Sequence, residues 1–180
     1  MTQTLWLASG SPRRRQLLEW AGFEVEVHPP EVPEARRPGE TPVGFAVRLA
    51  AEKAATGPAA GWVLAADTVV HREARLFGKP RSREEARRHL EALAGGWHAV
   101  TTAVCLRREG HEIPFRVTTR VRFRPLSEGE IGAFVATGEA DDKAGAYGIQ
   151  GRAGVFVAEI QGSWTNVMGL PIEACLERLR

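Results

Sequence analysis

The chain has 180 residues, of which 43% are hydrophobic, so it can bury a core, and we expect a single domain over residues 1–180. Its 24 basic and 22 acidic side chains give a net charge of +2, which argues against a protein that coats nucleic acid. The first residues lack the pattern of a signal peptide, and no apolar run approaches membrane-spanning length. Because no long apolar run is present, we expect no membrane partner. Cys105 and Cys175 lack a metal-binding or redox spacing, so we expect free thiols and a cytoplasmic location.

The predicted elements begin with a buried strand over residues 5–8, followed by the stretch SGSPRRR at residues 9–15. Ser11 is placed to cap a helix that Pro12 begins and Gly22 ends. Three arginines then occupy the first helical turn, where the amide groups and the helix dipole disfavour cations. Hydroxyl groups, a helix N-terminus and guanidinium groups together favour a phosphate-binding site. The alternative is a solvated basic turn whose arginines point outward.

A single aspartate stands out in the next part of the chain. The apolar run 62–66 predicts a central strand that carries Asp67 and Thr68 at its carboxyl end. An aspartate inside an apolar strand is costly to bury without a partner, so Asp67 is a candidate for catalysis or metal binding. The alternative is a structural aspartate that caps a nearby helix. The elements predicted before this strand are a strand at 23–27, a proline-rich loop at 28–40 and a helix from Thr41 to Gly57.

The second half of the chain continues with alternating helices and strands. Strands at 98–106 and 113–124 are expected to be antiparallel neighbours, and His89 is expected at the surface of its helix. Residues 141–152 are rich in glycine and show no periodicity, and the amide of Gln150 is suited to reading a base edge. The other predicted elements are a turn at 77–80, helices opened by Ser82, Ser127 and Pro171, a strand at 154–160 and a loop at 162–169.

Lysine and aspartate are rare, because the chain uses arginine and glutamate for most charges. Lysine differs from arginine, and aspartate from glutamate, in shape and reach, so a site built around one residue rejects the other. Each rare residue is therefore a candidate site residue, with chance as the alternative. These residues are Lys53, Lys79, Lys143, Asp67, Asp141 and Asp142.

Several segments, in order along almost the whole chain, resemble the Maf family of nucleoside triphosphate pyrophosphatases. They are LASGSPRR, VRLAAEKA, AADTVV, FGKP, DDKAGAYGIQGRAG and MGLPI. The resemblance implies an α/β fold of the Maf/ITPase-like type, with an elongated mixed sheet flanked by helices and two lobes around a deep cleft. It also implies hydrolysis of a nucleoside triphosphate to monophosphate and pyrophosphate, a divalent metal cation and a homodimer.

The same resemblance implies roles for individual residues. Asp67 matches the catalytic base, and the set Arg13, Thr68 and Gln150 matches a triad linked to the subfamily that prefers dTTP and UTP. The residues that match polar positions lining the cleft are Ser9, Arg13, Arg14, Glu34, Lys53 and Lys79.

The sequence hypothesis is that Arg13 and Arg14 bind the triphosphate, while Lys53 and Lys79 neutralise charge on the leaving pyrophosphate. Mg²⁺ or Mn²⁺ held by Glu34 and Asp67 would orient the phosphates, and Asp67 would take a proton from the attacking water. Two alternatives stay open. One is a non-catalytic nucleotide-binding regulator of cell division, and the other is a nucleic-acid-binding module that uses the arginine face of residues 116–124.

Overall fold

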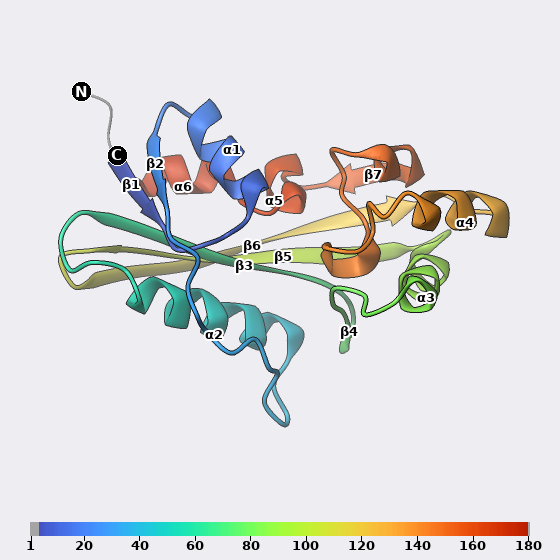
Figure 1. Cartoon of the computed structure of the whole chain (residues 1–180), viewed down its shortest axis with the longest axis horizontal. Helices are drawn as coiled ribbons and strands as arrows, with labels where there is room; N and C mark the ends of the chain where they lie inside the picture. The colour runs from blue at the N-terminus through green and yellow to red at the C-terminus, as the bar shows by residue number, and fades with distance from the viewer. Residues whose placement is uncertain (1–3, 180) are drawn as a thin grey trace. The chain divides into compact units, whose positions relative to one another are not determined.

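The computed structural model describes residues 4–179. Its strands form one seven-stranded sheet in the order β2-β1-β3-β5-β6-β7, with β4 paired to β3 (Figure 1). The strands are β1 (Thr4–Leu7), β2 (Glu24–Val27), β3 (Trp62–Arg72), β4 (Arg75–Phe77), β5 (Trp97–Arg108), β6 (His111–Phe123) and β7 (Val157–Gln161). The α-helices are α1 (Pro12–Trp20), α2 (Pro42–Ala55), α3 (Arg83–Leu93), α4 (Glu128–Ala136), α5 (Trp164–Met168) and α6 (Ile172–Leu179). Two 3₁₀ helices are η1 (Ala144–Ala146) and η2 (Arg152–Phe156). The sheet is mixed, since β1 runs parallel to β2 and β3 whereas β4 and β7 are antiparallel to their partners. The predicted mixed α/β sheet flanked by helices is confirmed.

Contacts group the described residues into two units. The first unit spans residues 4–68, 102–117 and 169–179, and the second spans 69–101 and 118–168. The expectation of a single domain over residues 1–180, and that of two lobes around a cleft, stay predictions. Of the helices that the structure describes, none combines the length and hydropathy needed to cross a lipid bilayer. Both cysteines are free thiols, as predicted, and the structure shows that both are buried.

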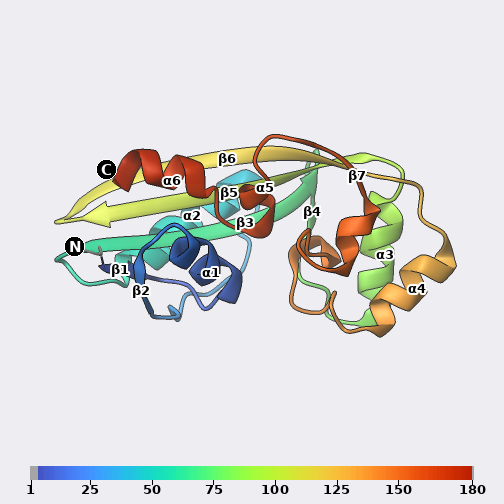
Figure 2. The ribbon, with the colours of Figure 1, turned by 90° about the horizontal axis from the view of Figure 1, so that it is seen from above.

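In the first unit, α2 covers one face of the sheet, and α1 and α6 lie on the opposite face (Figures 1 and 2). In strand β1, Leu5 and Leu7 are buried, Trp6 is half-buried and Thr4 is exposed. Helix α2 begins as predicted, since Pro42 occupies the first turn and the Thr41 hydroxyl accepts a hydrogen bond from the Gly44 amide. The fully buried side chains of this core include Leu5, Leu7, Leu17, Leu18, Leu49 and Leu64.

The register of β1 and β3 decides where Asp67 lies. Leu7 pairs with Leu64, and the Ala8 amide donates to the Leu64 carbonyl over 2.9 Å, where the pairing of the two strands ends. Strand β3 continues to Arg72, so Asp67 lies in the middle of a strand. The expectation that Asp67 stands at a carboxyl end is therefore wrong. Two polar residues interrupt the apolar run, yet the strand continues through them.

The second unit is built around aromatic side chains. Its core contains Phe77, Phe123, Phe134, Tyr147 and Phe156, and helix α3 packs against α4 and η1. His89 was expected at the surface but is buried, with its ring edge-on to Phe77 at a centroid distance of 5.5 Å. Burial lowers the pKa of His89, which favours the neutral ring that such packing requires.

Two loops of the second unit contain more structure than the sequence predicted. The glycine-rich segment forms η1, and η2 delays the next strand, so that strand begins at Val157 and not at residue 154. The predicted loop at 162–169 contains helix α5, where the Ser163 hydroxyl accepts from the Asn166 amide over 3.0 Å. The Asn166 side chain is fully buried and donates to the Val100 carbonyl over 3.0 Å. Helix α5 is too short to show a hydrophobic periodicity in the sequence, so it could not be predicted from the pattern.

The predicted hairpin between β5 and β6 is confirmed. The two strands are neighbours and are joined by Glu109 and Gly110, whose φ angles of 51° and 81° are both positive. Positive φ at both central residues matches the type I′ turn, whose twist fits a hairpin. The predicted alternation of β6 is also confirmed, because Thr119, Val121 and Phe123 are buried.

Candidate functional site

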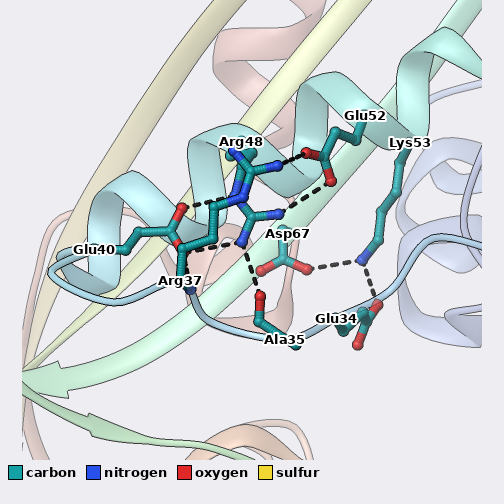
Figure 3. Close-up of polar contacts among 8 residues, drawn as sticks. All are labelled: Glu34, Ala35, Arg37, Glu40, Arg48, Glu52, Lys53 and Asp67. Carbon is teal, nitrogen blue, oxygen red and sulfur yellow. Dashed lines mark hydrogen bonds and ion pairs between the residues drawn. The ribbon is translucent and has the colours of Figure 1, made fainter.

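Two carboxylates meet one ammonium group in the first unit (Figure 3). The Lys53 Nζ atom lies 2.8 Å from Asp67 Oδ1 and 2.6 Å from Glu34 Oε1. The Lys53 and Asp67 side chains are 7% and 12% exposed, whereas the Glu34 side chain is 51% exposed. The three predicted site residues Glu34, Lys53 and Asp67 are therefore brought together, with Glu34 at the solvent side of the group.

Three different segments supply this group. Lys53 lies in the last turn of α2, where the helix dipole favours a cation. Asp67 comes from the middle of β3, and Glu34 comes from the loop between β2 and α2. Alternation along β3 turns Asp67 and Thr68 to opposite faces, and Asp67 takes the face that α2 covers.

The environment of Asp67 changes its proton affinity. Burial is the largest effect and raises the pKa of the Asp67 carboxyl, while the charge of Lys53, its hydrogen bond and the charge of Arg14 act in the opposite direction. A raised pKa makes the Asp67 carboxylate a stronger base. Asp67 contacts Lys53, and Glu34 lies at the solvent side of the same group. A base in such a position is suited to accepting a proton from water.

Arg14 joins three other groups of the first unit. Its Nη1 atom donates to Ser9 Oγ over 2.9 Å, its Nη2 atom to Thr68 Oγ1 over 3.1 Å, and its Nε atom to the Gly169 carbonyl over 2.9 Å. Burial lowers the pKa of Arg14, and the charge of Asp67 opposes that effect. The predicted site residues Ser9, Arg14 and Thr68 are thus adjacent, but three of the five N–H groups of Arg14 are already used within the protein.

The start of α1 differs from an ordinary capped helix. Within the described residues of α1, the first turn holds no acidic side chain, and the Ser11 side chain forms no capping hydrogen bond. The positive charge of Arg13 is one of the effects that lower the pKa of Arg14. Arg15 instead forms an exposed ion pair with Glu19 at 2.6 Å. Of the three arginines, Arg15 therefore has a partner on the exposed surface of its own helix.

Sequence reasoning missed two groups that contact Thr68. The Thr68 Oγ1 atom lies 2.9 Å from Thr102 Oγ1 and donates to the Gly169 carbonyl over 3.3 Å. A hydroxyl in the otherwise apolar strand predicted at 98–106 is the signal that could have singled out Thr102. Gly169 adopts a φ of +126°, which favours glycine, and its place just before Leu170-Pro171 was the only hint in the sequence.

Lys79 and Gln150 belong to the second unit, and both side chains are exposed. Lys79 follows strand β4, and Gln150 lies between η1 and η2. Their assignment to the site stays a prediction. Lys143, another rare residue, contacts Asp142 at 2.6 Å and donates to the Glu139 carbonyl over 2.7 Å, which gives it a local structural partner.

The residues present fit a divalent metal that is bound together with a substrate phosphate. Among residues 4–179, no group of three or more histidine, cysteine or acidic side chains is placed to bind a metal ion. The carboxylates of Glu34 and Asp67 nevertheless converge on one cation, the Lys53 ammonium group. Mg²⁺ is commonly bound by one or two carboxylates together with substrate phosphates. The site therefore suits a metal that arrives with a phosphate and does not suit an all-protein metal cage.

The chain is similar in sequence to several named proteins. The chain is 46% identical over 180 residues to the "dTTP/UTP pyrophosphatase" of Chromobacterium violaceum, an alignment that covers 93% of this chain and 89% of that protein. It is 47% identical over 184 residues to the protein of the same name from Anaeromyxobacter dehalogenans strain 2CP-1, covering 100% and 94%. The relative from Salmonella typhimurium, again named dTTP/UTP pyrophosphatase, is 46% identical over 180 residues, covering 98% and 91%.

A solved structure shares the fold at low sequence identity. The Ham1 protein of Staphylococcus aureus superposes with a TM-score of 0.52 at 12% identity, and the match covers 99% of this chain and 100% of that one. Residues 4–180 match the family described as Maf-like protein, which is the family that the sequence motifs indicated. The chain therefore belongs to the Maf-like protein family.

Proposed function

We propose that this chain is a nucleoside triphosphate pyrophosphatase that hydrolyses dTTP and UTP to the monophosphate and pyrophosphate. The observation that supports it most directly is the convergence of Glu34 and Asp67 on Lys53. The relatives that are 46–47% identical carry the name dTTP/UTP pyrophosphatase, and the chain covers at least 89% of their length. Its biological role is the removal of unwanted nucleotides from the cellular pool.

In this proposal Asp67 is the catalytic base. It accepts a proton from the water molecule that attacks the α-phosphorus, and the bond between the α-phosphorus and the bridging oxygen to the β-phosphorus breaks to release pyrophosphate. Lys53 orients the Asp67 carboxylate through their 2.8 Å contact. A Mg²⁺ or Mn²⁺ ion held by Glu34 and Asp67 would supply charge neutralisation at the phosphates and lower the pKa of a water molecule.

The remaining predicted residues bind the substrate. Arg13 binds the triphosphate, together with the N–H groups of Arg14 that are not used by Ser9, Thr68 and Gly169. Lys53 and Lys79 neutralise charge on the departing pyrophosphate. Thr68 and Gln150 read the pyrimidine, since a wrong base would leave their polar groups unpaired. The homodimer, the cytoplasmic location and the lack of a nucleic-acid partner stay predictions.

The proposal is tested by measuring pyrophosphate release from dTTP, UTP, dCTP and dATP with added Mg²⁺ or Mn²⁺. We expect turnover of dTTP and UTP above the other two nucleotides. The Asp67→Asn variant, which keeps the shape of the side chain, is expected to lose about 10²- to 10⁴-fold in kcat, the range typical for removing a general base. Glu177→Gln is the matched control, because Glu177 is an exposed carboxylate of α6 that has no role in the proposed site.

Two results would contradict the proposal. Full turnover by Asp67→Asn would remove Asp67 from the role of base. Tight binding of dTTP by the unmodified protein, with no pyrophosphate released under any metal condition, would instead favour a nucleotide-binding regulator.

A further inference from the structure

The loop that carries Glu34 has no regular secondary structure. Residues 28–41 connect β2 to α2, and the described backbone there forms neither helix nor strand. The Glu34 side chain is 51% exposed, and its ion pair with Lys53 is formed at the solvent side. An ion pair exposed to that degree contributes little to ordering a segment, because water screens it and two side chains lose freedom. Better shielded contacts elsewhere in the loop would add to its attachment where Glu34 reaches Lys53.

Arg48 supplies such a contact from the middle of α2 (Figure 3). Its guanidinium group donates to both oxygens of Glu40, over 2.7 and 2.9 Å, and to Glu52 over 3.1 Å. It also donates over 3.0 Å to the carbonyl of Ala35, the residue next to Glu34. The Arg48 and Glu40 side chains are only 14% and 12% exposed, so this ion pair is better shielded than that of Glu34.

Further contacts within the loop extend the attachment. The Glu40 carboxylate accepts from the Arg37 amide over 3.0 Å, and the Arg37 side chain donates to Glu52 over 2.9 Å. The bond to Arg48 is the largest of the effects that lower the pKa of Glu40, to about 2, which keeps Glu40 charged. Glu40 thus joins the end of the loop to α2, and Arg48 joins its middle to the same helix.

We propose that Arg48 is a positioning residue for the candidate catalytic group. It holds residues 34–40 against α2, and so fixes Glu34 beside Lys53 and Asp67. Its planar fork reaches Glu40, Glu52 and the Ala35 carbonyl at once, which a lysine at the same place cannot do. The role assigned to Glu34 rests on the proposed function, whereas the attachment of the loop by Arg48 does not.

The attachment is tested first without substrate, by amide hydrogen exchange of residues 31–40. Arg48→Ala is expected to exchange faster in this segment than the unmodified protein, and Arg48→Lys to fall between them. Arg124→Ala is the matched control, since Arg124 also contacts a glutamate, Glu130 at 2.6 Å, and two backbone carbonyls, but in the second unit. Equal exchange of residues 31–40 in all four proteins would overturn the proposal.

The link to Glu34 is tested by kinetics in a double-mutant cycle. In the unmodified background, Arg48→Ala is expected to lower kcat/KM by about 10- to 100-fold, the usual cost of losing an outer partner of a metal-ligating group. In a Glu34→Ala background the same change is expected to cost less than about twofold, because residues acting through one another are not additive. Arg48→Lys should recover part of the loss, and Arg124→Ala should keep the unmodified kcat/KM.

The outcomes separate the two proposals. Equal losses from Arg48→Ala in both backgrounds would show that Arg48 acts independently of Glu34 and would overturn the inference. If Arg48→Ala is too unstable to purify, Glu40→Gln removes the same attachment from the loop side and is subject to the same cycle. A protein that releases no pyrophosphate from any nucleotide contradicts the proposed function, and the exchange comparison then still decides whether Arg48 holds the loop.

Discussion

The two contact units bury polar side chains in different ways. The buried polar side chains of the first unit include a charged pair, Lys53 and Asp67, with the half-exposed Glu34 beside it. In the second unit the buried His98 Nε2 and the Tyr147 hydroxyl form a neutral 2.8 Å hydrogen bond among aromatic rings. Burial lowers the pKa of His98 to about 3 and raises the pKa of Tyr147, so both stay uncharged near neutral pH.

The two units differ in what it costs to bury their polar groups, and this difference indicates which unit holds a site. A neutral hydrogen-bonded pair loses little on burial, whereas the Asp67 carboxylate and the Lys53 ammonium group must each give up strong hydration. Packing alone does not require the charges, since apolar residues of similar volume often replace a buried ion pair without loss of stability. The charged group of the first unit is therefore the better candidate for a site that acts on a substrate.

The largest effect is expected from the aromatic core. Phe123 is fully buried and its ring lies 4.8 Å from that of Tyr147 and 4.9 Å from that of His98. Phe123→Ala is expected to lower the free energy of unfolding by about 3–5 kcal/mol, through lost transfer energy and a cavity. Phe115→Ala, on the same strand but half-buried in the first unit, should cost clearly less. Urea denaturation measures both, and equal losses would contradict this account of the second unit.

A smaller loss is expected from removing the cation of the first unit. Lys53→Met leaves the buried Asp67 carboxylate without its ion-pair partner, which is expected to cost about 3 kcal/mol in unfolding free energy. Lys143→Met is the control, since Lys143 pairs with the exposed Asp142 and should lose less than about 1 kcal/mol. Adding Asp67→Asn to Lys53→Met should restore part of the loss. A double variant less stable than Lys53→Met would show that the carboxylate charge is not the cause.

A pH effect of intermediate size is expected from the second unit. Burial, with the charges of Arg72 and His71, lowers the pKa of His98 to about 3, from 6.5. The unfolded chain then binds more protons than the folded protein between these two values, so stability falls as the pH falls from 6.5 toward 3. The slope from this one group is at most about 1.4 kcal/mol per pH unit.

His98→Gln isolates this contribution. The variant keeps a hydrogen-bonding amide near the Tyr147 hydroxyl but cannot be protonated in this range. Unfolding free energies of the two proteins, measured by urea denaturation at several pH values between 4.5 and 7, should converge as the pH falls, because only the unmodified protein loses the His98 term. His89, whose pKa is also lowered by burial, is present in both proteins and cancels in the difference. Parallel curves would contradict a neutral buried His98.

The smallest effect compares two helix starts. In α4 the Ser127 hydroxyl accepts from the Glu130 amide, and the Glu130 side chain accepts from the Ser127 amide, so the capping box is complete. Ser127→Ala is expected to cost about 1 kcal/mol in unfolding free energy. Ser11→Ala at the start of α1 should change stability by less than about 0.5 kcal/mol, because the Ser11 side chain makes no capping bond. Equal costs in thermal or urea unfolding would show that Ser11 caps α1 after all.

Patterns of local sequence predicted most of the elements. The alternation of β6, the apolar run of β3 and the capping box at Ser127 each depend on residues close together in the chain, and each is confirmed. The buried position of His89 and the helix α5 could not be predicted in this way, because both depend on partners distant in sequence, such as Phe77 and the Val100 carbonyl.

The candidate site was only partly accessible to the same reasoning. The rarity of lysine and aspartate singled out Lys53 and Asp67, and the structure brings these two together. The three donor bonds of Arg14 and the attachment of the loop by Arg48 depend on residues as far apart as Arg14 and Gly169. Such contacts leave no periodic trace in the sequence. Arg48 and Glu52 carried only the spacing of an ordinary helical ion pair.

Strand β3 extends beyond the end of its pairing with β1, and Asp67 and Thr68 are consecutive residues in this extension. The Asp67 side chain lies on the face that α2 covers, where Lys53 donates to it. The Thr68 side chain lies on the opposite face, where Arg14 donates to it. Inserting or deleting one amino acid between Leu64 and Asp67 would exchange the two faces and send each side chain to the wrong partner. The spacing of this short stretch is therefore constrained as tightly as its chemistry, and length variation in the protein is expected to concentrate elsewhere.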